Sequence, residues 1–112
     1  QPNSGADESF AFFNVNKTMV RVLFNDILYV ESMREYIYIN TQKGRIVTKM
    51  TTSVMEKMLG ENFLRIHRSF IVNIRKVTAF NAEDIFIDRV TVPIGASYKK
   101  QVEDVFRKHL IS

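Results

Sequence analysis

The segment from residue 61 to residue 74 concentrates side chains that bind anions. Arg65, His67, Arg68 and Ser69 lie within five positions, directly before an apolar stretch. Arginine offers a planar fork to phosphate or guanine, and a serine hydroxyl can donate a hydrogen bond to phosphate. The segment indicates either a loop that contacts phosphates and bases or an ordinary solvated loop with a structural histidine.

Two further loops carry similar chemistry. Gly95 precedes a predicted helix whose first turn holds Lys99 and Lys100, where free amide groups and the helix dipole favour an anion. In residues 32–36, Arg34 is placed to reach a phosphate or a base, and Tyr36 to pack on a sugar. Each loop also has a simpler interpretation. Lys99 and Lys100 can be ordinary exposed lysines on a helix, and residues 32–36 can be an ordinary hairpin tip with a surface arginine.

The sequence gives no support for catalysis or for a metal site. Cysteine is absent, and His67 and His109 lie far apart without acidic or histidine neighbours at metal-ligand spacing. Glycine-rich nucleotide motifs and the serine nucleophile motif are also absent. Asp84 and Asp88 flank a strand, where charged residues are usually solvated. We therefore expect a protein without enzyme activity, cofactor or metal.

Composition indicates one globular domain with a short leader. The chain has 112 residues, of which 46% are hydrophobic, and a formal net charge of +4. Residues 1–10 are rich in Pro, Gly, Ser and Asn and contain Asp7 and Glu8 but no basic residue, so residues 11–112 alone carry +6. We expect 1–10 to be a linker or disordered leader on a piece of a longer protein, and 11–112 to be the domain. The apolar runs are far shorter than the roughly 20 residues of a membrane helix, so no membrane association is expected.

The elements that position these loops are mainly β. Alternating and β-branched patterns predict strands at 19–24, 27–30, 36–41, 45–50, 69–74, 77–80, 84–87 and 89–94. In residues 36–41, Ile37 and Ile39 share one face, whereas Tyr36 and Tyr38 share the other. Pro93 cannot donate a ladder hydrogen bond, which favours an edge or terminal position for the last strand.

Apolar residues at helical spacing predict helices at 53–59 and 97–110. Ser53 and Glu56 have capping-box spacing, and Gly60 fits the end of the first helix. Ser97 is the candidate N-cap of the second helix. The prediction is a β-rich domain with one short internal helix and one C-terminal helix.

The order of these motifs resembles the LytTR family, the DNA-binding output domains of LytR/AgrA-type bacterial response regulators. The resemblance covers roughly residues 12–110. It rests most on FLRIHRSFIVN, from Phe63 to Asn73, and on PIGASY, from Pro93 to Tyr98. ILYVES followed by MREYIYINT, from Ile27 to Thr41, adds to it.

The resemblance implies an elongated antiparallel β-sandwich whose loops, not a recognition helix, read successive major grooves of duplex DNA. Carried onto this chain, the implied base contacts come from Arg34, Tyr36, Arg68 and the position of Ala96. The implied phosphate contacts come from Arg65, Ser69, Ser97, Lys99 and Lys100. His67 is implied to support its loop or to touch the DNA backbone.

One position departs from the family pattern. The family often has arginine or another long polar residue where this chain has Ala96, which can touch a thymine methyl but cannot hydrogen-bond a base. The resemblance further implies a cytoplasmic protein with an upstream receiver domain and a full-length dimer on paired sites. Single-stranded RNA binding through the Tyr36 and Tyr38 face, and a protein-interaction module, remain the alternatives.

Overall fold

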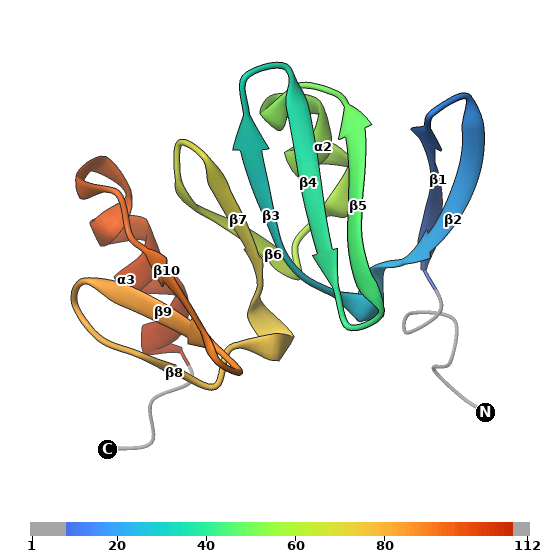
Figure 1. Cartoon of the computed structure of the whole chain (residues 1–112). Helices are drawn as coiled ribbons and strands as arrows, with labels where there is room; N and C mark the ends of the chain where they lie inside the picture. Colours follow the sequence, from blue (N-terminus) through green and yellow to red (C-terminus); the bar gives the residue numbers. More distant parts are fainter. Residues whose placement is uncertain (1–8, 109–112) are drawn as a thin grey trace.

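The computed structural model describes residues 9–108, and this part of the chain is mostly β (Figure 1). The strands in chain order are β1 (Phe10–Val15), β2 (Thr18–Leu23), β3 (Ile27–Met33), β4 (Tyr36–Thr41), β5 (Gly44–Lys49), β6 (Phe63–His67), β7 (Phe70–Asn73), β8 (Ala79–Phe80), β9 (Asp84–Ile87) and β10 (Val90–Pro93). The α-helices of the described residues are α2 (Thr52–Leu59) and α3 (Lys99–Arg107). The predicted mainly β class, with a short internal helix and a helix late in the chain, is confirmed.

The strands form three antiparallel sheets. A central five-stranded sheet has the order β5-β4-β3-β7-β6, β1 pairs with β2, and a three-stranded sheet has the order β10-β9-β8. In β4 the predicted alternation is confirmed, because Ile37 and Ile39 are fully buried whereas Tyr36 is 43% exposed. Strand β10, which ends at Pro93, lies at the edge of its sheet as predicted.

Two apolar cores lie on opposite faces of the central sheet. Consecutive strand residues point to opposite faces, and the neighbours Ile71 and Val72 of β7 belong to different cores. The first core joins the sheet to α2 and to the β1–β2 hairpin, through residues such as Met55 and Phe13. The second core joins the sheet to α3 and to the three-stranded sheet. The central sheet is therefore held from both sides (Figure 1).

Two strands differ from the sequence-based expectation. Phe10, the last residue of the predicted leader, begins β1, while residues 1–8 of that leader lie outside the described residues. Strand β6 lies where a polar loop was expected. Its pairing with β7 shifts between Arg65 and His67, and Phe63 and Ile66 are both buried although they are three residues apart. This irregularity breaks the period-two pattern from which a strand is predicted.

Both predicted N-caps are wrong, whereas the predicted end of the first helix at Gly60 is confirmed. Helix α2 begins at Thr52, so its N-cap is Thr51, whose Oγ1 accepts a hydrogen bond from the Val54 amide at 3.3 Å. Gly60 does end α2, with φ of 85°. Helix α3 begins at Lys99, because a 3-10 turn (Ala96–Tyr98) occupies the preceding residues, and its start has no side-chain cap. The predicted end of this helix, including His109 and Leu110, lies outside the described residues.

Candidate nucleic-acid interface

Three loops that carry predicted contact residues lie along one edge of the domain, and we call this the three-loop edge. They are the β3–β4 turn, the β6–β7 turn and the β10–α3 loop, all at the upper edge in Figure 1. The Ser32 amide donates to the Ser69 carbonyl at 2.8 Å, and the Gly95 amide donates to the Ile66 carbonyl at 2.8 Å. Backbone hydrogen bonds at the bases of the loops therefore fix the loops side by side.

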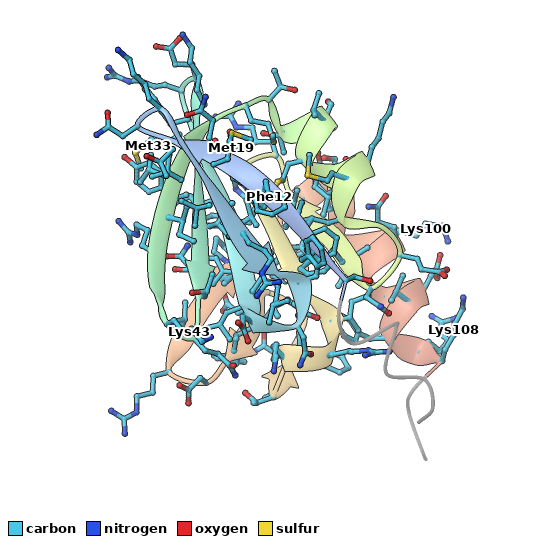
Figure 2. All side chains as sticks on the ribbon, turned by 90° about the vertical axis from the view of Figure 1, so that its right-hand side faces the viewer. Phe12, Met19, Met33, Lys43, Lys100 and Lys108 are labelled. Atoms are coloured by element: carbon cyan, nitrogen blue, oxygen red, sulfur yellow. The ribbon has the colours of Figure 1, made fainter. Side chains whose placement is uncertain are left out.

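The opposite end of the central sheet is remote from this edge. Figure 2 shows Met33, at the end of β3, near the top of the molecule, and Lys43, in the β4–β5 turn, near the bottom. Lys43 lies 3.7 Å from the Asp26 carboxylate. Substitutions of basic residues at that end therefore serve as controls, because they remove the same charge at a position remote from the three-loop edge.

The β3–β4 turn presents Arg34 to solvent. The turn has two residues, since Met33 and Tyr36 form the last cross-strand pair, and Arg34 takes the left-handed conformation with φ of 60°. Within residues 9–108 the Arg34 side chain has no hydrogen bond or ion pair. An open groove of about 450 Å³ runs beside it towards the start of α2 and is also lined by Arg65. Arg34 is thus free to contact a ligand.

The β6–β7 turn presents Arg68. Its carbonyl accepts a hydrogen bond from Nη2 of Arg65 at 2.7 Å, and the next amide, of Ser69, donates to Nδ1 of His67 at 3.0 Å. Because Nδ1 accepts, the proton of the neutral imidazole lies on Nε2. The His67 ring packs edge-on against Phe70. The Arg68 carbonyl and the Ser69 amide are therefore paired within the domain, while the exposed Arg68 guanidinium has no partner among the described residues.

The β10–α3 loop is exposed at Ala96 and Ser97. The two lysines that follow have acidic neighbours within the domain. Nζ of Lys99 lies 2.9 Å from the Glu83 carboxylate, and Nζ of Lys100 lies 4.0 Å from that of Asp104. An ion is therefore not needed to explain lysines at this helix start. Lys100 is 89% exposed, and an exposed pair of this kind contributes little, so its charge stays available.

The ten predicted residues divide into two groups. The exposed ones are Arg34, Tyr36, Arg68, Ala96, Ser97 and Lys100, and the partly buried ones are Arg65, His67, Ser69 and Lys99. Sequence reasoning gave no role at the site to Glu56, Tyr98 or Gln101, which contact Arg65. Their contacts join elements distant in the chain, so local spacing carries no signal for them.

Gly95 allows the β10–α3 loop to approach β6 closely. A β-carbon there would lie 3.1 Å from Cδ1 of Tyr98 and 3.4 Å from Cα of His67. Gly95→Val is expected to destabilise the domain by about 1–3 kcal/mol, because added methyl groups overpack this contact. Urea unfolding measures the change. Ala82→Val, at an exposed turn, should stay within about 0.5 kcal/mol, and equal effects of the two variants would contradict the close-contact explanation.

Neither a metal site nor a membrane span emerges from the part of the chain that the structure describes. Its histidine and acidic side chains form no group of three or more that could hold a metal ion. None of its helices is long and apolar enough to cross a membrane.

Comparison with known proteins identifies the class. Residues 17–107 match the family model of the LytTr DNA-binding domain. The chain therefore belongs to the LytTR family of DNA-binding domains, as the resemblance in the sequence indicated. A solved LytTr DNA-binding domain from Bacillus cereus shares the fold, with a TM-score of 0.76 and 24% identity, over 88% of this chain and 96% of that one.

Two longer proteins named LytT are similar to this chain in sequence. The chain is 31% identical over 100 residues to the sensory transduction protein LytT of Bacillus cereus, covering 83% of this chain and 41% of that protein. It is 27% identical over 110 residues to the LytT protein of Bacillus subtilis, covering 92% of this chain and 46% of that protein. The chain thus spans less than half the length of these relatives.

Proposed function

We propose that this DNA-binding domain recognises specific sequences in duplex DNA, as the output domain of a two-component response regulator that controls transcription. The three-loop edge would enter the major groove. The observation that carries the proposal is the placement of Arg34 and Arg68 on adjacent turns joined by the Ser32–Ser69 hydrogen bond, both exposed and both without a side-chain partner within residues 9–108. Arginine is the commonest side chain for direct guanine readout.

The remaining residues of the edge receive supporting roles. Tyr36 lies next to the β3–β4 turn, and Ala96 offers a methyl contact to thymine. Ser69, Ser97, Lys99 and Lys100 supply phosphate contacts, and Nε2 of His67 is the free imidazole donor beside them. Phosphate contacts provide affinity that falls with salt, whereas base contacts provide sequence preference.

Lys100 provides a test of the phosphate contacts. Lys100→Ala is expected to weaken binding to all duplexes alike and to reduce the slope of log K against log salt by about 1. Lys43→Ala is the matched control, because the Lys43 side chain is 81% exposed beside one acid, close to the 89% of Lys100, but lies at the far end of the sheet. Fluorescence anisotropy over a salt series measures both variants. A loss restricted to one DNA sequence would contradict the assignment of Lys100.

Selection from a pool of random duplexes tests the function itself. A shared motif among the recovered duplexes is expected, and recovery without any motif would exclude sequence-specific readout. Competition with single-stranded RNA separates the RNA-binding alternative. That alternative is less favoured, because the guanidinium of Arg45 already covers the Tyr38 ring at 5.1 Å.

The wider assignment is part of the same proposal. The matched relatives are named sensory transduction proteins and are more than twice as long as the matched region. We assign the domain to a cytoplasmic protein in which an upstream receiver domain, once phosphorylated, brings two copies onto paired DNA sites. Binding to single and paired motifs by the full-length protein tests this, and equal affinity for both would contradict it.

A further inference from the structure

The Arg65 side chain lies inside the three-loop edge rather than on its surface. Only 21% of the side chain is exposed. Its Nη2 donates to the Arg68 carbonyl at 2.7 Å, and its Nη1 lies 3.7 Å from Oε1 of Glu56 in α2. One guanidinium therefore joins the β6–β7 turn to a helix from a different part of the chain.

The same residue also contacts the third loop. Cζ of Arg65 lies 5.9 Å from the centroid of the Tyr98 ring, and the Arg65 carbonyl accepts a hydrogen bond from Nε2 of Gln101 at 3.3 Å. Its Nε is buried and has no partner among the described residues. An unpaired buried donor is unfavourable, so the surrounding contacts, and not full hydrogen-bond satisfaction, hold the guanidinium in place.

We propose that Arg65 is a positioning residue that aims Arg68, and that it is not a phosphate contact. This inference rests on the proposed DNA-binding function. Because the Arg68 carbonyl is held in place, the adjoining Cα, and with it the direction of the Arg68 side chain, is also constrained. The Arg65 guanidinium is already engaged with that carbonyl and with Glu56, whereas the Arg68 guanidinium has no partner among the described residues.

The substitution Glu56→Gln distinguishes the two roles of Arg65, because they predict changes of opposite direction in DNA binding. A carboxylate near the DNA face repels phosphates, so Glu56→Gln should strengthen binding if Arg65 is a phosphate contact released by the change. If Arg65 positions Arg68, the same variant loosens the turn and lowers the ratio of specific to nonspecific affinity. Glu61→Gln, an exposed change of equal charge just after α2, controls for the general electrostatic effect.

Arg65→Met and Arg65→Lys complete the experiment. Loss of the guanidinium in Arg65→Met is expected to reduce affinity for the selected duplex about 10- to 100-fold, with an unchanged salt slope, because charge-assisted hydrogen bonds contribute on this scale. Lysine replaces a phosphate-binding charge well but lacks the planar fork. Arg65→Lys should therefore regain little specificity. A salt slope reduced by about 1 with specificity retained, or full rescue by lysine, would overturn the proposal.

NMR spectra of the free domain provide a readout that needs no DNA. Glu56→Gln and Arg65→Lys are expected to shift the amide signals of Arg68 and Ser69, whereas Glu61→Gln leaves them in place. Unchanged turn amides would overturn the positioning role even if DNA binding is altered. If the variants shift these amides but the unmutated domain shows no preference for duplex DNA, the proposed function is refuted, and with it the role of Arg65 in DNA recognition, while Arg65 still positions the turn.

Discussion

Arg68→Ala should weaken binding to the preferred duplex by about 1–3 kcal/mol and relax the preference at one base position. Arg68 is exposed, its side chain has no partner in the part of the chain that the structure describes, and Arg65 and His67 hold the backbone of its turn. Its guanidinium is thus presented from a fixed base, which reduces the entropy lost when it binds guanine. Binding to a panel of single-base variants of the selected site, at constant salt, measures both effects.

The matched control is Arg89→Ala. Arg89 is also exposed, but it lies in the β9–β10 turn, and its loss removes the same charge. We expect it to leave the ranking of the DNA panel unchanged. If Arg68→Ala also keeps that ranking and only lowers every affinity, Arg68 contacts phosphate and not a base.

Asn73→Leu should destabilise the fold by about 2–4 kcal/mol, because each unsatisfied buried polar group costs on the order of 1–3 kcal/mol. Asn73 is 2% exposed. Its Nδ2 donates to the Ile27 carbonyl at 2.8 Å, and its Oδ1 accepts from the Arg75 amide at 3.0 Å. This one side chain connects the end of β7 to the start of β3. Leucine has the same number of side-chain heavy atoms and the same branching at Cγ but cannot replace either hydrogen bond.

Urea unfolding of Asn73→Leu and Asn81→Leu provides the comparison. The Asn81 side chain also accepts hydrogen bonds, from the amides of Glu83 and Asp84, but Asn81 is exposed and water can replace it. Its loss should therefore cost less than that of Asn73. Equal destabilisation by the two variants would show that burial of the Asn73 hydrogen bonds is not the cause.

The local sequence pattern predicts much of the fold. The alternation around Ile37 and Ile39 gave the correct face of β4, and Pro93 gave the edge position of β10. Strand β6 was missed because its irregular register buries Phe63 and Ile66 at a spacing that is not typical of a strand. Strand β1 was missed because Phe10 was grouped with the leader and because the consecutive apolar residues from Phe10 to Phe13 do not alternate with polar ones.

The sequence predicts which residue types belong to the candidate site, but it does not predict which acidic side chains those residues pair with. The sequence pointed to arginines and lysines on three loops as candidate contacts, and the structure brings those loops to one edge. It also shows that Arg65 pairs with Glu56 and that Lys99 pairs with Glu83. Those acids come from other parts of the chain, so only the tertiary structure shows which cations already have an acidic neighbour within the domain.

The hydrogen bonds at the bases of the loops have a consequence for redesign. The Ser32–Ser69 and Gly95–Ile66 bonds join backbone atoms, so they do not depend on which side chains occupy the tips. The backbone arrangement of the three loops and the side chains at their tips can therefore be changed independently. Under the proposed function, new operators can be sought by randomising Arg34, Arg68 and Ala96 as a library, while the scaffold that spaces them is left untouched.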